Sequence, residues 1–390
     1  MKDGRLSAFF KLLTGNSVAQ VASLLFYPYI ARLYSPEDFS NYGFIFSTVA
    51  VLSVFATGQF HLAFLNPTDE SEVNKLIGVS TVCSLIFTAV FAFYVLVFVP
   101  HLWVMPIYLL LYSLFDIQRM VFIRKKAFTE TLYAQSTYRI FGNLFKLAPP
   151  MVAVKSLGMV LSEIVSLVMV LSYGVFKKTF RFSFDLATFK KYRHFPLFQT
   201  FSMATSIVIN DFPVLLWTTL HDKTFIGYYV LGQRLLIIPC QVLANAIQNS
   251  SIHHLLESQH LRREITKLFL GLLGLGLTAS LAFLFIGEDL LALFLGKKWS
   301  MEGDVFKLMA LLFPTKFMIV SSQALLVLKN KTGLVLMTRL LQLGVVSLTL
   351  VAGMDFYQSL TLFILTDVIF DIILTTVAIK LVFSSNSIRS

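Results

Sequence analysis

The residues best able to do chemistry in this chain are polar and charged side chains inside long apolar runs. Arg139, Asn143 and Lys146 are spaced i, i+4 and i+7, so all three share one face of an expected helix. Other deep polar residues on helix faces are Arg234, Gln241, Lys316 and Arg339. A charge at the bilayer centre costs about 2.5–3.5 kcal/mol on insertion scales. Such groups therefore indicate a wet cavity, a ligand site or an interhelical ion pair.

The deep acidic residues are fewer, and they limit what the cations can do. Asp367 and Asp371 are i, i+4 neighbours, and two carboxylates so placed would share a proton or meet a cation. With Asp211 they are candidates for proton or sodium coupling. An excess of deep cations suits a polyanion such as a pyrophosphate. The alternative is ion pairing, for instance Arg339 with Asp367 or Asp371. The sequence shows no pattern of a catalytic triad, a metal site or a phosphate-binding glycine loop, so we expect no cofactor and no enzyme.

The elements that position these residues are expected to be transmembrane helices. The chain is 56% hydrophobic and 14% charged over 390 residues, with a mean hydropathy of +0.76; a soluble domain has about 25% charged residues. Long apolar runs without period-two alternation favour helices over a barrel. Twelve segments of sufficient length are predicted: 11–33, 39–65, 74–99, 102–123, 129–154, 156–176, 196–220, 224–250, 266–287, 305–327, 332–352 and 357–380. The predicted class is an all-α polytopic membrane protein.

The net charge of +11 follows the predicted topology. With a cytoplasmic N-terminus, twenty basic residues fall on the inner side and five on the outer side. This bias places both termini in the cytoplasm. The basic run 177–193 then serves orientation and contact with anionic lipid, and nucleic acid is not an expected partner.

The two halves of the chain resemble each other. With one inserted residue, the stretch 27–43 aligns with 212–229, pairing Pro28 with Pro213. We predict two pseudo-symmetric six-helix lobes, 1–176 and 196–390, joined by a basic cytoplasmic linker, 177–195. Parallel repeats of this kind place a substrate path between the lobes. Pro28 and Pro213 are candidate hinges for alternating access, because proline kinks a helix.

Three stretches resemble lipid-linked oligosaccharide flippases of the multidrug, oligosaccharidyl-lipid and polysaccharide exporter superfamily. The most specific piece is ARLYSPEDF (31–39); the others are 192–217, followed by 227–248, and LFLGKKWSMEGDVFKLMALLFP (293–314). GQRLL, which contains Arg234, matches the family pattern. Gln59-Phe60-His61 departs from it, because the family often has Arg-Tyr-Glu there.

The resemblance implies a Wzx-type flippase of a bacterial inner membrane. It would carry an undecaprenyl-pyrophosphate-linked O-antigen or similar repeat unit to the periplasmic leaflet. Arg139, Lys146, Arg234, Lys316 and Arg339 would hold the pyrophosphate, with Asn143 and Gln241 beside them. Partners would be the lipid-linked substrate, membrane lipids, a glycan polymerase and a chain-length regulator. Two alternatives are a cation-coupled multidrug exporter of the same superfamily and a membrane glycan polymerase.

Overall fold

The structure is a computed structural model. It describes residues 22–65, 69–148, 155–177, 183–193, 200, 207–208, 210–211, 213–240, 242, 244, 261–300, 303–328, 332–351 and 353–384. All regular elements in these ranges are helices, and none is a strand. Seven helices of the described part are long and apolar enough to cross a membrane. The predicted class, an all-α polytopic membrane protein, is confirmed.

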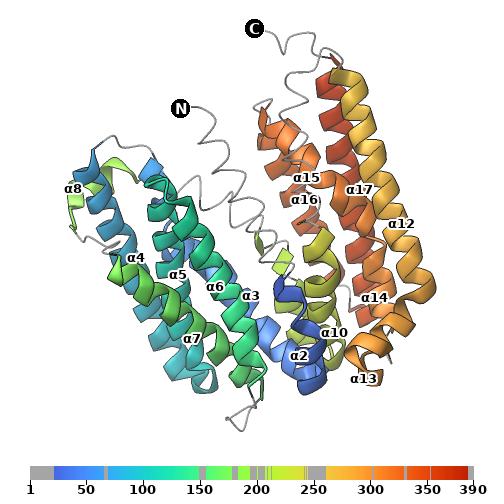
Figure 1. Cartoon of the computed structure of the whole chain (residues 1–390), viewed down its shortest axis with the longest axis horizontal. Helices are drawn as coiled ribbons and strands as arrows, with labels where there is room; N and C mark the ends of the chain where they lie inside the picture. Colours follow the sequence, from blue (N-terminus) through green and yellow to red (C-terminus); the bar gives the residue numbers. More distant parts are fainter. Residues whose placement is uncertain are drawn as a thin grey trace. The chain divides into compact units, whose positions relative to one another are not determined.

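The first of two compact units comprises residues 1–26 and 41–215, as far as they are described. Its helices α4, α5, α6 and α7 pack side by side, and the short α8 lies against α4 (Figure 1). The bounds in this unit are α4 Glu70–Phe98, α5 Val104–Arg124, α6 Phe128–Lys146, α7 Lys155–Phe176 and α8 Leu186–Lys191, with 3-10 turns η1 Phe60–Leu65 and η2 Pro100–Leu102. Val90, Phe93 and Phe98 of α4 are each about two-thirds exposed, as expected for a helix that faces lipid.

The second unit comprises residues 27–40 and 216–390. In it α15 contacts α12 and α17, and α16 packs on α17. The bounds are α2 Tyr27–Leu33, α10 Lys223–Gly232, a π-helical turn η3 Gln233–Ile237, α12 Leu261–Leu295, α13 Lys297–Ser300, α14 Gly303–Ala310, α15 Phe313–Leu328, α16 Thr332–Val351 and α17 Phe356–Ser384. Helix α3, Pro36–Ala56, begins in this unit and continues in the first. This division differs from the predicted lobes, which remain a prediction about internal repeats.

Two prolines mark interruptions in the predicted spans. The first span breaks at a turn over residues 25–26, and Pro28 lies in the first turn of α2, where its missing N–H leaves no bond unmade. The predicted segment 305–327 is two helices, α14 and α15, with Pro314 at the start of α15. Pro213 is buried in the helical stretch 213–220. Both proposed hinges therefore lie in helices, but their role in motion remains a prediction.

Trp299 fixes residues 27–40 within the second unit. Its indole Nε1 donates to the carbonyl oxygen of Ala31 at 2.8 Å, and its ring meets Phe39 and Tyr228 edge-on, both at 5.3 Å. Lys298 Nζ donates to the carbonyl oxygen of Tyr34 at 2.6 Å. A cation there satisfies carbonyls at the end of α2, where the helix dipole is negative. The 27–40 segment is thus held by packing and by hydrogen bonds to its backbone.

Gly227 gives the first testable consequence of this packing. A Cβ at this position would lie 1.8 Å from the carbonyl oxygen of Pro36. We expect Gly227→Ala to lower the free energy of unfolding by about 1–3 kcal/mol, because backbone must move to make room. Thermal denaturation in detergent measures the loss. Gly271→Ala is the matched control, since nothing lies within 4 Å of its Cβ; equal stability of both variants would contradict the packing described here.

Candidate functional site

The first unit contains a buried cluster built on Lys146 of α6 and Glu163 of α7. The ammonium of Lys146 forms an ion pair with Glu163, and the two residues are 1% and 6% exposed. Tyr42 of α3 donates its hydroxyl to Glu163 Oε1 at 2.7 Å. Lys146 Nζ also donates to Tyr42 and to Asn143 Oδ1, at 3.1 and 3.3 Å. Three helices therefore meet on one lysine–glutamate pair.

Asn143 extends this cluster to the break in the first span. Its Nδ2 donates to the carbonyl oxygen of Ser23 at 3.1 Å, one turn before α2 begins. A helix break leaves backbone carbonyls without intrahelical partners, and a side-chain amide satisfies one of them here. Gly142 lets α6 approach α7 closely, since a Cβ there would contact Glu163 Oε2 at 3.3 Å.

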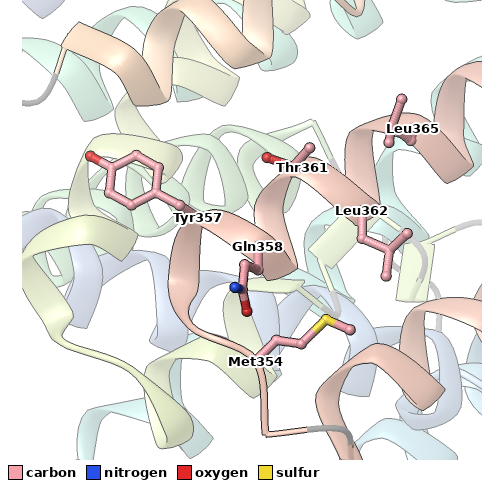
Figure 2. A pocket seen from close by; sticks show the side chains of 6 residues that line it. All are labelled: Met354, Tyr357, Gln358, Thr361, Leu362 and Leu365. Atoms are coloured by element: carbon pink, nitrogen blue, oxygen red, sulfur yellow. The ribbon is translucent and has the colours of Figure 1, made fainter.

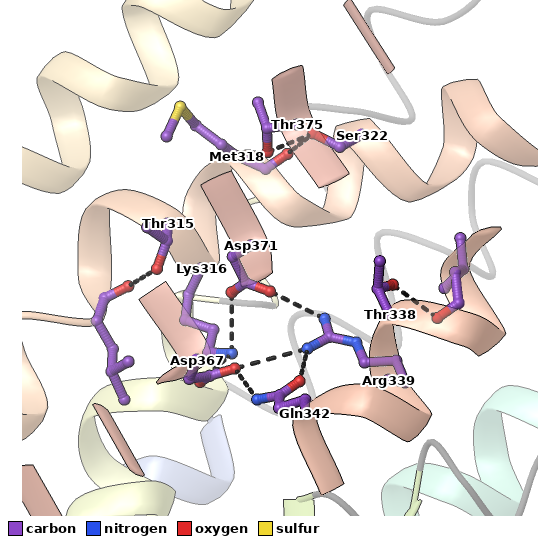
Figure 3. A network of polar contacts seen from close by, with 12 residues as sticks. Thr315, Lys316, Met318, Ser322, Thr338, Arg339, Gln342, Asp367, Asp371 and Thr375 are labelled. Carbon is purple, nitrogen blue, oxygen red and sulfur yellow. Dashed lines mark hydrogen bonds and ion pairs between the residues drawn. The ribbon is translucent and has the colours of Figure 1, made fainter. Parts of the chain in front are cut away.

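The second unit contains a cluster of two cations and two carboxylates from α15, α16 and α17 (Figure 3). Lys316 Nζ lies 2.6 Å from Asp367 Oδ2 and 3.1 Å from Asp371 Oδ2. Arg339 Nη2 lies 3.0 Å from Asp371 Oδ1, and Nη1 lies 3.6 Å from Asp367 Oδ1. Gln342 bridges the group, accepting from Arg339 at 2.7 Å and donating to Asp367 at 2.8 Å.

These side chains are almost entirely removed from solvent. The exposed fractions of the side chains are 8% for Lys316, 11% for Arg339, 5% for Asp367 and 0% for Asp371. Formal charges cancel within the cluster, and the i, i+4 spacing on α17 lets both carboxylates reach both cations. The alternative expected from the sequence, an ion pair of Arg339 with Asp367 or Asp371, is therefore present.

The other predicted site residues lie in different surroundings. Arg139 is half-buried, one turn before Asn143 on α6. Arg234 is half-buried in the π-helical turn η3, which the sequence did not predict; such turns often occur at functional sites. Asp211 accepts a hydrogen bond from Ser47 Oγ at 2.7 Å. Gln241 lies outside the described residues.

A cavity of about 530 Å³ opens along the beginning of α17 (Figure 2). The lining residues are Met354, just before the helix, and five residues on one face of α17: Tyr357, Gln358, Thr361, Leu362 and Leu365. The face combines an aromatic ring, an amide and a hydroxyl with apolar side chains, a mixture typical of small-molecule sites. Sequence reasoning missed it, although its i, i+3, i+4 spacing was readable.

Comparison with known proteins decides the family. Residues 29–301, more than half of the chain, match the family model described as "Polysaccharide biosynthesis protein". The chain belongs to this family. No curated protein sequence matches it.

The fold of this family member resembles solved transporter structures. An inward-facing multidrug resistance MATE family transporter of the MOP superfamily is 10% identical, with a TM-score of 0.70 and coverage of 97% of this chain and 96% of that one. The lipid II flippase MurJ, in an inward closed conformation, is 13% identical, with a TM-score of 0.72 and coverage of 96% and 87%. The eukaryotic MATE transporter AtDTX14 is 11% identical, with a TM-score of 0.57 and coverage of 98% and 96%. At these identities the likeness shows the fold alone, a multi-pass helical membrane fold that these transporters also have.

Proposed function

We propose that this protein is a flippase for a polyprenyl-pyrophosphate-linked oligosaccharide, an O-antigen or related surface-glycan repeat unit. One observation carries the proposal: a polysaccharide biosynthesis family member has the fold that the lipid II flippase MurJ also has. We further propose a bacterial inner-membrane location with both termini in the cytoplasm, which the distribution of basic residues supports. A glycan polymerase and a chain-length regulator would act on the flipped product.

The cations differ in how accessible they are to a pyrophosphate, because some are more deeply buried than others. A phosphate that reached Lys146, Lys316 or Arg339 would have to displace a buried carboxylate, and opening such a pair costs about 3–5 kcal/mol. Arg139 and Arg234 are only half-buried. Because part of each of these two side chains stays accessible, we rank Arg139 and Arg234 ahead of the other three as candidates for the first contact with pyrophosphate. Lys146, Lys316 and Arg339 retain a part in binding only where their ion pairs with carboxylates open.

The same reasoning ranks the candidates for ion coupling. Asp367 and Asp371 already hold two side-chain cations, so a sodium ion would have to displace an ammonium or a guanidinium. Asp211, which accepts a hydrogen bond from Ser47 Oγ, remains a candidate for proton or sodium coupling beside them. The cavity along α17 would receive part of the oligosaccharide, since Tyr357, Gln358 and Thr361 offer stacking and hydrogen bonds.

Arg234 supplies the test of the pyrophosphate assignment. We expect Arg234→Gln to lower export of surface glycan about 10–100-fold. This is the effect of losing one charge-assisted hydrogen bond, which contributes about 1.5–3 kcal/mol. Export is measured by complementation of a strain from which the gene is deleted, with protein level followed in parallel. Lys267→Gln is the matched control, because Lys267 lies at the surface in an exposed i, i+3 pair with Glu264. Full export by Arg234→Gln would refute the assignment.

The multidrug exporter remains the second candidate, because a multidrug resistance transporter shares the fold. The two functions differ in what deletion of the gene does. A flippase defect leaves lipid-linked repeat units on the cytoplasmic leaflet, whereas an exporter defect lowers resistance to cationic drugs. Accumulation without drug sensitisation supports the flippase; sensitisation without accumulation supports the exporter.

A further inference from the structure

Helix α8 and its flanking residues are fixed to the beginning of α4. Asp185 caps α8 by accepting from the Ala187 N–H at 3.0 Å, and it also lies 3.4 Å from Lys75 Nζ. Lys191, at the other end of α8, forms an ion pair with Glu72. The Ala187 N–H holds the pKa of Asp185 below its usual value, and the bond to Glu72 raises the pKa of Lys191. Asp185 and Lys191 therefore stay charged near neutral pH.

Close packing supports these ion pairs. A Cβ on Gly78 of α4 would lie 2.5 Å from the carbonyl oxygen of Ser183, so backbone meets backbone there. Phe189 contacts Phe60 with ring centroids 5.4 Å apart, and Tyr192 packs against the apolar core of the first unit. The position of α8 is thus set by α4, beside which it lies in Figure 1, and by Phe60 of η1.

The charge pattern of α4 puts that position near the expected edge of the hydrocarbon. Lys75, which pairs with Asp185, is the last charged residue of α4 before the uncharged stretch 76–98. Helix rise is about 1.5 Å per residue, so residues that contact the first two turns of α4 lie within about 10 Å of the hydrocarbon. The predicted topology puts this end of α4 on the cytoplasmic side.

The exposed surface of this segment carries both apolar and basic side chains. Phe184 and Leu186 are 55% and 57% exposed, and Phe189 is 36% exposed. Lys190 and Arg193 of the same segment are exposed too. In water the apolar side chains would cost about 25 cal/mol for each Å² left exposed. A lipid interface removes that cost, and its anionic head groups complement the basic residues.

We propose that Phe184, Leu186, Phe189, Lys190 and Arg193, the α8 surface, form an interfacial anchor that binds anionic phospholipid head groups. The apolar side chains enter the head-group boundary, and the basic ones contact lipid phosphates. The anchor fixes the chain that follows the sixth predicted span to the cytoplasmic leaflet. It does not depend on what the protein transports.

The test places a fluorophore on the α8 surface of the full chain. A Leu186→Cys variant, in a Cys83→Ser, Cys240→Ser background, is labelled with an environment-sensitive dye and reconstituted in vesicles. One set of vesicles is phosphatidylcholine alone; the other includes phosphatidylglycerol. We expect quenching by spin-labelled lipid to increase with phosphatidylglycerol. Lys190→Gln with Arg193→Gln should raise the phosphatidylglycerol content needed for half-maximal quenching about tenfold or more, since each basic residue contributes about 1 kcal/mol.

A label at Lys223→Cys is the control, because Lys223 is exposed at the beginning of α10, on the side predicted to be periplasmic. It should show no dependence on phosphatidylglycerol. Equal quenching of the Leu186 label in both vesicle types would overturn recognition of anionic lipid. Quenching of that label by aqueous iodide rather than by lipid would overturn the anchor itself.

Discussion

Glu163→Ala is expected to remove about 3–5 kcal/mol of folding free energy. The change leaves the ammonium of Lys146 buried, at 1% exposure, without the carboxylate that neutralises it. A lone charge in a membrane helix bundle is costly, so the loss should be seen as a lower unfolding temperature in detergent and as a smaller yield of folded protein.

A compensating double variant separates charge from packing. Lys146→Met with Glu163→Leu removes both charges at similar volume, and we expect it to recover most of the stability, as apolar replacements of buried pairs often do. If Glu163→Ala alone stays within about 0.5 kcal/mol of the parent protein, the pair is not the buried contact described here.

Asp371→Asn is expected to cost about 3–5 kcal/mol in the second unit. The four-charge cluster becomes two cations on one carboxylate, with Asp371 the most buried member at 0% exposure. Adding Lys316→Met restores one cation and one anion, Arg339 and Asp367, and should recover part of the loss. Unfolding temperatures of the single and double variants give the coupling energy.

Asp289→Asn is the matched control for Asp371→Asn. Asp289 is an exposed acidic residue of α12 in the same unit, so its loss should change stability by about 0.5 kcal/mol or less. Asp371→Asn with normal stability but no transport would contradict the structural role and support ion coupling at this carboxylate.

The sequence predicted the helical class and most helix positions, because long apolar runs are a strong local signal. The prediction 156–176 compares with α7 at Lys155–Phe176, and 332–352 with α16 at Thr332–Val351. Helix ends were less well predicted where a proline interrupts an apolar run. Pro314 lies at such a break, where α15 follows α14 within one predicted span.

The partners of the buried charges were less predictable than their positions. The shared face of Asn143 and Lys146 follows from helical spacing, but Glu163 meets Lys146 only because α6 packs on α7 beside Gly142. The contact of Lys316 with α17 likewise depends on tertiary packing. The π-helical turn around Arg234 has no sequence signature that we used.

The central claim is transport of a lipid-linked oligosaccharide, and reconstitution tests it most directly. Purified protein in vesicles should move a fluorescent polyprenyl-pyrophosphate oligosaccharide between leaflets. An external reducing agent that cannot cross the membrane, or an external lectin, then reaches the labelled lipid that has moved to the outer leaflet. Arg139→Gln with Arg234→Gln, folded and at equal density, should slow this movement to the rate of empty vesicles. Equal rates in parent and empty vesicles, with the parent protein folded, would contradict the claim.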